Sequence, residues 1–365
     1  MDTARIQGLV LKVCFSIVFT EFLLGIAVTA CYTVIKGRSR PTLDPRAQSS
    51  VYKGKPWAES YWQEYASATR FDYRAYVGWG LPPYHGETIS TDQQGFRRTF
   101  SSRCDAETYT AWMFGGSAVW GEGSPDWLTI PSQLALEYSN SGRQVCVRNF
   151  GVRGWVSTQE VIDLALELKR APRKPDLVVF YDGVNDVFSF YQSGEIDVHQ
   201  NFDHIRDLFE QGGSLREILE NRLSLIFRVT GSGHSRLRYV TDEEAKLELD
   251  TAYLKNMRIV DALAKEYGFD YAFFWQPVIL AGHKELSGEE EAIRKVCLQK
   301  YPGMDLFFLK IYALVSAEPR PRLFDVSGTL DQQKGTIYID FHHLGPEGNH
   351  LIAARMFRIL HQQGR

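Results

Sequence analysis

The sequence lacks any long tract of lysine and arginine, and it contains few cysteines. Its 41 basic and 44 acidic residues give a formal net charge of −3 over 365 residues. Without a basic tract that can follow a phosphate backbone, the chain is not expected to bind nucleic acid. Five cysteines are too few for a disulfide framework. No asparagine begins an Asn-x-Ser/Thr site, so N-glycosylation is not indicated.

The overall composition is that of an ordinary globular protein. Hydrophobic residues make up 44% and charged residues 23% of the chain, which excludes the disordered and fibrous classes. At about 150 residues per domain, the length allows roughly two domains, or one large domain with insertions.

An apolar stretch near the N-terminus, residues 13–35, contains a single charge, Glu21. A helix of this length, at about 1.5 Å per residue, can cross a hydrocarbon core of about 30 Å. The sequence therefore predicts a membrane anchor over residues 1–36. One alternative is a lipoprotein signal that ends at Cys31, although a charge inside the apolar stretch argues against it. The other is a buried helix of a soluble domain.

The side of the membrane and the role of Glu21 are open at this stage. Basic residues after the stretch slightly outnumber those before it, which favours a cytoplasmic body. They are Arg5 and Lys12 before it, and Lys36, Arg38 and Arg40 after it. Glu21 is either a contact to a partner helix or a protonated side chain tolerated in a lone anchor.

Residues 37–109 are predicted as a linker, to about residue 47, followed by an aromatic-rich cap. The aromatic side chains of this region are Tyr52, Trp57, Tyr61, Trp62, Tyr65, Phe71, Tyr73, Tyr76, Trp79 and Tyr84. Two interpretations compete: a platform on which sugar rings stack, or a cap whose rings pack against the main domain.

From residue 110 on, short apolar runs alternate with helical patterns. The runs at 110–114, 144–149, 177–181 and 271–275 are predicted as strands. Helices are predicted at 130–138, 157–168, 241–266 and 346–360, two of them opening with the capping boxes Ser157–Glu160 and Thr241–Glu244. This alternation predicts a three-layer α/β/α sandwich with a mostly parallel sheet over residues 110–365. Residues 187–240 are too long for a simple connection and are predicted as an insertion.

Polar residues and glycines follow three of the predicted strands and precede the last helix. Ser117 follows the first strand, Asn185 the third, and the pair Asp340 and His343 precedes the helix at Pro346. A serine hydroxyl becomes a nucleophile when a base removes its proton. His343 can be that base, and a carboxylate three residues earlier can orient it.

An acyl-transfer site also needs donors aimed at the oxyanion of the tetrahedral intermediate. The backbone N–H groups of Ser117 and Gly154, with the side-chain amide of Asn185, are predicted to supply them.

Arg153 and Asp186 are further candidates for substrate binding. His342 is the alternative to His343 as the base. No metal is expected, because Asp340, His342 and His343 lack a recognised ligand spacing and no Cys-x-x-Cys occurs.

These segments resemble the four blocks of the SGNH (GDSL-type) hydrolase superfamily, whose name gives Ser, Gly, Asn and His in that order. The matching positions are Ser117, Gly154, Asn185 and His343, with Gly-x-Asn-Asp at 183–186 and Asp-x-x-His at 340–343. One departure is Gly116, where the family usually has Asp; that Asp is not part of the family's triad. The resemblance covers about residues 110–360 and implies an SGNH fold, a Ser117–His343–Asp340 triad and no cofactor.

The resemblance implies a membrane-anchored serine ester hydrolase that removes small O-acyl groups, such as acetyl, from a carbohydrate. It also favours an extracytoplasmic body, against the weak charge signal. Three alternatives stay open. The same triad could transfer the acyl group to a polysaccharide; the substrate could be a lipid ester or thioester; or the chain could be a non-catalytic subunit of a membrane assembly.

Overall fold

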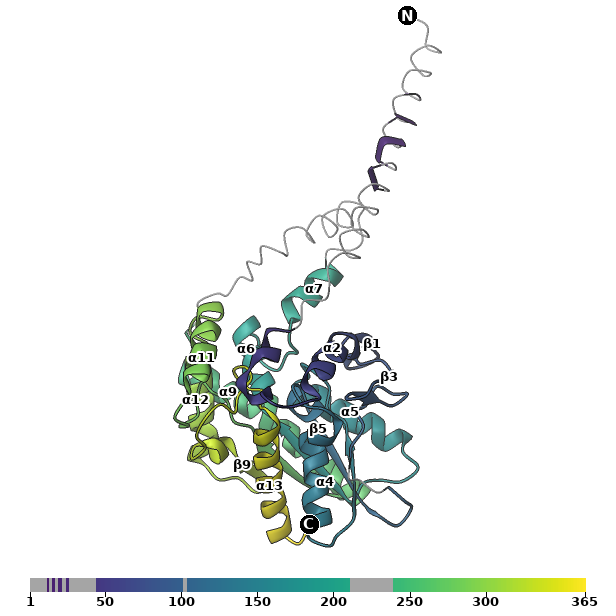
Figure 1. The fold of residues 1–365 in the computed structure, drawn as a ribbon, viewed down its shortest axis with the longest axis vertical. Helices are drawn as coiled ribbons and strands as arrows, with labels where there is room; N and C mark the ends of the chain where they lie inside the picture. Colours follow the sequence, from purple (N-terminus) through teal and green to yellow (C-terminus); the bar gives the residue numbers. More distant parts are fainter. Residues whose placement is uncertain are drawn as a thin grey trace, which may run out of the picture. The chain divides into compact units, whose positions relative to one another are not determined.

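The computed structural model describes residues 44–100, 104–210 and 239–365, together with a few residues of the N-terminal segment (12, 15, 16, 19–21, 24 and 25). The chain divides into two units, Met1–Asp44 and Pro45–Arg365. The second unit carries the fold described below (Figure 1).

The N-terminal prediction falls mostly outside the described residues. None of the helices formed by described residues combines the length and the apolarity needed to span a membrane. Glu21 is described, and it is helical and exposed, whereas Cys31 and most of residues 13–35 are not described. The anchor and the lipoprotein alternative therefore stay predictions.

A five-stranded sheet lies at the centre of the second unit. Its strands are β5 (Tyr109–Gly115), β6 (Val145–Asn149), β7 (Leu177–Asp182), β8 (Asp270–Trp275) and β9 (Leu323–Asp325). They lie in the order β6-β5-β7-β8-β9, and each neighbouring pair is parallel. Every residue of β7 is buried, as expected for a strand covered on both faces. The predicted α/β fold with a parallel sheet is confirmed.

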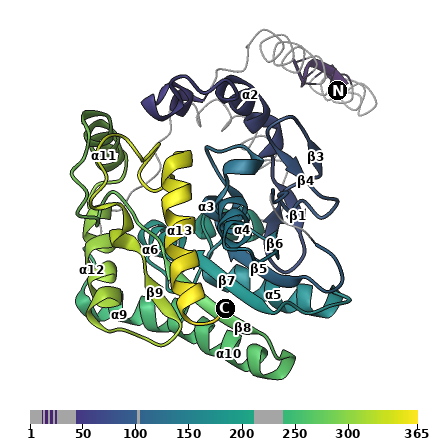
Figure 2. The ribbon, with the colours of Figure 1, turned by 60° about the horizontal axis from the view of Figure 1, so that its bottom comes forward.

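Helices cover both faces of this sheet (Figure 2). Helices α4 (Ile130–Asn140) and α13 (Pro346–Gln362) pack together on one face, and α5 (Ser157–Arg170) and α10 (Lys255–Tyr267) pack together on the other. The other helices of this domain are α3 (Ser117–Trp120), α6 (Val184–Ser193), α7 (Phe202–Glu210), α9 (Asp242–Glu248), α11 (Gly288–Lys300) and α12 (Met304–Ala317). A π-helical turn, Leu249–Leu254, joins α9 to α10.

One of the two predicted capping boxes is wrong and the other is confirmed. The N-cap of α5 is Val156, not Ser157, and Ser157 turns its hydroxyl inward to Asp186. Because the helix begins at Ser157 itself, the N–H to be capped is that of Val156, and it donates to Oε1 of Gln159 at 3.2 Å. At α9, by contrast, Thr241 accepts from the N–H of Glu244. The sequence pattern is the same at both helices, but at α5 the Ser157 hydroxyl is buried and bonds Asp186 instead of capping the helix.

The segment that precedes the sheet is part of the same unit, from Pro45 on. It contains the 3₁₀ turns Pro45–Gln48 and Ser50–Tyr52, helix α2 (Ala58–Ala68) and two hairpins, β1 (Asp72–Arg74) with β2 (Gly78–Gly80) and β3 (Tyr84–His85) with β4 (Ser90–Thr91). The predicted boundary at residue 109 is therefore not a domain boundary.

The two interpretations of the aromatic segment separate along the chain. Four of its rings are buried with Trp120 and Ile339 of the main domain: Tyr52, Tyr61, Trp62 and Tyr65. This half is a packed cap. Three later rings are exposed, Phe71, Tyr73 and Tyr76, and packing does not account for them.

A disulfide joins Cys104, before β5, to Cys146 in β6. The cysteine count gave no sign of this pair. Cys297 is a buried free thiol.

The predicted insertion begins inside a core helix. Residues 187–193 belong to α6. This helix packs on α12 through Phe190 and Phe307, whose ring centroids are 5.4 Å apart. Helix α7 follows, and residues 211–238 lie outside the described part of the chain.

Acidic side chains gather in the core between α5, β7 and α6. Burial raises the pKa of Asp182 to about 8 and that of Asp186 to about 6. Burial also raises the pKa of Glu160 well above its usual value, and the charges of Asp182, Asp186 and Asp163 add to the shift. Tyr253 of the π-helical turn donates to Asp182. The fold therefore holds protons on carboxyl groups near neutral pH.

These carboxyl groups predict a fall in stability as the pH rises from about 5.5 to 8. The folded pKa of Asp182, about 8, lies above the unfolded value near 4. The stability that this proton contributes is fully present below pH 4, decreases while only the unfolded chain has lost the proton, and is lost once the pH has passed about 8. We expect the melting temperature to fall by on the order of 5 °C over this window, measured by calorimetry.

The variant Glu160→Gln is the control for this effect. Its amide has no titratable proton and adds no charge beside Asp182, so the slope between pH 5.5 and 8 should flatten. An equal slope in the variant and the wild type would show that the carboxyl group of Glu160 is not a source of it.

Candidate active site

The predicted site residues lie where the order of the strands reverses. Ser117 follows β5, Gly154 follows its neighbour β6, and Asn185 follows β7 on the other side. Ligands of open α/β sheets bind outside the carboxyl ends of the strands at such a point. Asp340 and His343 reach it from the loop before α13.

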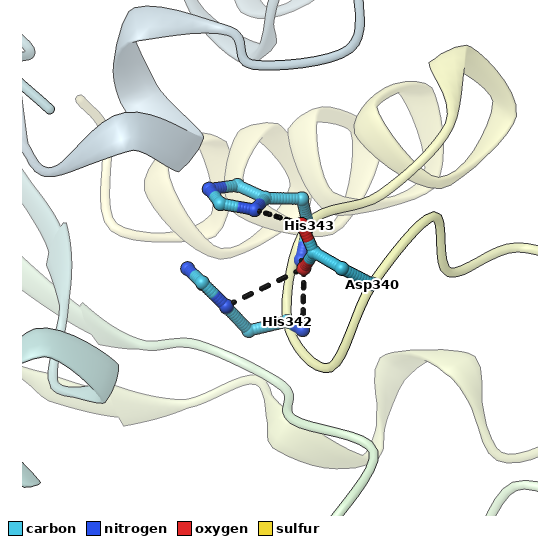
Figure 3. Close-up of side chains that lie close together, drawn as sticks. All are labelled: Asp340, His342 and His343. Atoms are coloured by element: carbon cyan, nitrogen blue, oxygen red, sulfur yellow. Dashed lines mark hydrogen bonds and ion pairs between the residues drawn. The ribbon is translucent and has the colours of Figure 1, made fainter. Parts of the chain in front are cut away.

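Ser117, His343 and Asp340 form a continuous chain of hydrogen bonds. The Oγ of Ser117 lies 2.6 Å from Nε2 of His343, and Nδ1 of His343 lies 2.7 Å from Oδ2 of Asp340. The other oxygen of Asp340 accepts the backbone N–H of His343 at 2.9 Å (Figure 3). With its proton on Nδ1, the imidazole presents Nε2 as the acceptor for the serine proton.

Asn185 lies against the glycine that precedes the serine. A Cβ at Gly116 would come within 2.2 Å of its Nδ2 atom, so a side chain at 116 would displace the amide. The same Nδ2 donates to the carbonyl of Trp155 at 2.7 Å, and Oδ1 accepts from Gln200 at 2.9 Å.

The remaining oxyanion candidates are backbone groups near this amide. Ser117 is the first residue of α3, where an N–H has no partner inside the helix. Gly154 has a φ of +77°, a conformation that favours glycine. The structure thus brings Ser117 and Asn185 together and places Gly154 in the loop that Asn185 holds through Trp155.

A second carboxylate, Glu122, lies buried beside His343. Its Oε2 atom is 3.8 Å from Nε2 of the imidazole. Arg153 donates to the same oxygen at 2.6 Å, and Tyr65 donates to Oε1 at 2.6 Å. When His343 takes up the serine proton, the imidazolium therefore has one carboxylate at each ring nitrogen.

Arg46 joins the two carboxylates. Its Nη1 atom donates to Glu122 at 2.7 Å and to Asp340 at 2.8 Å, and Nη2 donates to Tyr65 at 3.1 Å. Arg46 comes from the first turn of the cap, a stretch whose sequence is typical of a linker. The triad therefore depends on a residue almost 300 positions away from its acid.

The charges of this network keep both carboxyl groups ionised. Burial raises the pKa of Glu122, but the charges of Arg153, His343 and Arg46 outweigh it and hold the pKa well below its usual value. For Asp340, burial acts in the same direction, and His343, His342 and Arg46 hold the pKa well below its usual range.

His342 does not contact Ser117, and His343 does. Both ring nitrogens of His342 are buried without a hydrogen-bond partner, and its ring lies on those of Phe341 and His343, 4.3 and 3.8 Å away. Burial and the charge of His343 lower the pKa of His342 to about 3, so this ring is neutral at physiological pH.

Among the described residues, Asp340, His342 and His343 also form a group in which each offers one ligand atom, all within 4.8 Å of one another. Both ring nitrogens of His343 are engaged by Asp340 and Ser117. A metal ion bound there would compete with the triad.

The two predicted substrate-binding residues differ in their surroundings. Arg153 lies in the site through its ion pair with Glu122. Asp186 is buried in the core, where it accepts from the N–H and the hydroxyl of Ser157 at the start of α5. These contacts give Asp186 a structural role, and the prediction that it binds substrate has no contact in its favour.

Sequence reasoning missed Glu122 and Arg46. Glu122 stands between two glycines five residues after the serine, a setting that is typical of a loop and carries no charge partner nearby in sequence. Arg46 stands in a polar stretch with prolines. Only the folded chain brings them to His343.

No family model and no curated protein matches the sequence. Solved structures do resemble it. One is the lipase/acylhydrolase from Enterococcus faecalis (15% identity, TM-score 0.38, 70% of this chain and 97% of that one). A second is an acetyl xylan esterase (14% identity, TM-score 0.33, 68% of this chain and 98% of that one). A third is a member of the lipolytic G-D-S-L family from Veillonella parvula (14% identity, TM-score 0.34, 68% of this chain and 97% of that one). At such low identity, the activity has to be argued from the site.

The bridging role of Arg46 predicts a large effect of Arg46→Met. Two partly or fully buried carboxylates would lose the cation between them, which costs about 3 kcal/mol of folding free energy. Turnover should fall as well, because Asp340 loses a side-chain donor that positions it. Denaturant unfolding and ester assays on the full-length chain measure the two effects.

Two further variants complete this test. Arg46→Lys keeps the charge but not the fork that reaches both carboxylates and Tyr65, so its loss should be intermediate. Lys265→Met removes an exposed pair with Asp261 and should change stability by less than about 1 kcal/mol. A loss at Arg46→Met no larger than that at Lys265→Met would refute the bridging role.

Proposed function

We propose that this chain is a serine ester hydrolase of the SGNH type that removes small O-acyl groups, such as acetyl, from a carbohydrate. The observation that carries the proposal is the chain of hydrogen bonds from Ser117 through His343 to Asp340, with Asn185 beside the serine. This is the arrangement that acyl transfer through an acyl-serine requires.

The reaction follows from these positions. Ser117 Oγ attacks the ester carbonyl while Nε2 of His343 takes its proton. The oxyanion that forms is stabilised by the Asn185 amide and the backbone N–H groups of Ser117 and Gly154. The intermediate expels the sugar alkoxide, which takes the proton from His343 and leaves an acyl-serine. Water, losing a proton to His343, then attacks the acyl-serine, and the acid and free Ser117 are released.

Glu122 contributes through charge. The imidazolium exists only while the proton rests on His343, and it then lies between Asp340 and Glu122. Carboxylates that are already fixed by Arg46 and Arg153 need no rearrangement at that moment. In many enzymes, electrostatic stabilisation by groups held in place in this way lowers the barrier more than any other single effect.

Substitutions in the site should separate catalytic from structural residues. Ser117→Ala and His343→Gln are expected to abolish turnover of p-nitrophenyl acetate, and Asn185→Ala to lower kcat about 10²- to 10³-fold as a lost oxyanion donor. His342→Leu should keep turnover, because the His342 ring is not part of the chain of hydrogen bonds from Ser117 through His343 to Asp340. Full turnover by Ser117→Ala in a folded chain would refute the assignment.

A series of p-nitrophenyl esters distinguishes the acyl groups. A small-acyl hydrolase should prefer acetate, with rates that fall from acetate to octanoate. Rates that rise with chain length would instead support the lipase or thioesterase alternative. Turnover that needs an added sugar acceptor would support acyl transfer.

We further propose that the body lies outside the cytoplasm, tethered by residues 13–35. The disulfide between Cys104 and Cys146 supports this, since such bonds persist in oxidising compartments. After alkylation at the moment of lysis, peptide mass spectrometry should find these two cysteines linked and Cys297 as a free thiol. Alkylated Cys104 and Cys146 in cells of the natural host would contradict the location.

A further inference from the structure

We propose that the exposed aromatic face of the β1–β2 hairpin is a glycan-binding platform that extends from the active site. This face is formed by Phe71, Tyr73, Trp79 and, in the turn, Tyr76. The inference rests on the proposed carbohydrate esterase function and deepens it, because it says where the sugar chain beyond the ester lies.

Strand register places the rings on one face of the hairpin. Tyr73 lies directly opposite Trp79 in the antiparallel pair, so their side chains point the same way. Phe71 is two residues before Tyr73, and its ring centroid is 6.1 Å from that of Trp79. The opposite face turns inward: Arg74 stacks on Phe96 at 4.4 Å.

Three of the four rings of this face are open to solvent, and Trp79 is partly buried. Phe71 is 54% exposed, Tyr73 85% and Tyr76 79%. Tyr76 also has a φ of +72°, which costs an aromatic residue free energy and favours glycine instead. The earlier aromatics of the same segment are buried in the cap, so this exposure is a property of the hairpin alone.

The face begins at the loop that holds the oxyanion donors. Trp79 Nε1 donates to the carbonyl of Arg153 at 2.9 Å, and Trp155 Nε1 donates to the carbonyl of Trp79 at 3.0 Å. A Cβ at Gly154 would lie 3.6 Å from the Trp79 ring. Asn185 bonds the carbonyl of Trp155. A molecule whose ester lies at Ser117 therefore has Trp79, the first ring of this face, beside the loop of the oxyanion donors.

A sugar chain fits this surface better than an acyl chain. A pyranose lays its C–H face on an aromatic ring and keeps its hydroxyl groups in water, so an open ring face is enough. An alkyl chain on the same face would leave half of its surface in water and gain little. Polar groups for the hydroxyls stand close by: the ring of His199 lies 5.6 Å from that of Trp79, and the tyrosines carry hydroxyls of their own.

The test uses Tyr73→Ser and Tyr76→Ser, two exposed positions whose loss leaves the core intact. The full-length chain is assayed on acetylated xylan, acetylated pectin and acetylated chitosan, and on p-nitrophenyl acetate. For the polysaccharide that is turned over, each substitution should raise KM about 3- to 10-fold, with kcat unchanged. Turnover of p-nitrophenyl acetate, which is too small to reach the hairpin, should not change.

Tyr239→Ser is the matched control, because Tyr239 is exposed but contacts Lys310 of α12 instead. Its KM should equal that of the wild type. Unchanged KM in the hairpin variants would overturn the platform, and so would Ser117-dependent turnover of p-nitrophenyl acetate without turnover of any polysaccharide. If these variants instead lose co-sedimentation with phosphatidylcholine/phosphatidylglycerol vesicles, the face is a membrane contact and the platform is also overturned.

Failure of the proposed function is read separately. If p-nitrophenyl acetate is not turned over at all, the esterase proposal fails, and affinity electrophoresis of the Ser117→Ala chain in gels that contain each polysaccharide decides the platform by itself. Retardation that is lost in Tyr73→Ser and Tyr76→Ser would uphold glycan binding. No retardation would overturn it.

Discussion

The guanidinium of Arg46 lies between two carboxylates, and the geometry of the site depends on that contact. Asp340 comes from the loop before α13 and Glu122 from the loop after α3, and Nη1 of Arg46 bonds both at 2.8 and 2.7 Å. Two carboxylates that contact the same guanidinium nitrogen would, without this cation, repel each other in a desolvated site. One cation from the cap thus allows two anions to flank His343. This also explains why the cap has a packed core against Trp120 and Ile339: a mobile cap could not fix Arg46.

The loop that carries Glu122 is itself held from the cap side. Arg97 is fully buried and donates to the carbonyls of Trp120, Gly121 and Ser124 as well as to Asp126. A planar guanidinium with five N–H groups suits such a set of fixed acceptors, whereas a lysine would not. Arg46 and Arg97, both from the part of the chain that precedes the sheet, therefore shape the surroundings of Ser117 in the α/β domain. The candidate catalytic residues belong to the α/β domain, and part of their electrostatic environment comes from the cap.

The sequence was sufficient for those parts of the fold that repeat locally. Four of the five strands and the helix at Pro346 follow from apolar runs and capping signals, and Ser117, Asn185, Asp340 and His343 follow from their places at the ends of these elements. Strand β9 has three residues, too few for a periodic pattern. Ser157 and Glu160 match the capping-box pattern in residue type, but both side chains are buried in the core. Glu122 and Arg46 are identified by long-range contact alone, which no local pattern encodes. Local sequence also could not divide the aromatic segment, because aromatic residues occur throughout it while only the earlier ones are buried.

Two groups of buried carboxyls in this fold have opposite pKa shifts, and the presence of cations is what separates them. Asp340 and Glu122 have Arg46, Arg153 and His343 close by, and their pKa values lie well below the usual range. Glu160 and Asp182, in the core between α5 and β7, have other carboxyls as neighbours, and their pKa values are raised. As the pH rises through about 8, Asp182 of the second group loses its proton. A decline of the enzyme over this range would then begin as a loss of packing between α5 and the sheet, while the charges of Asp340 and Glu122 stayed as they were.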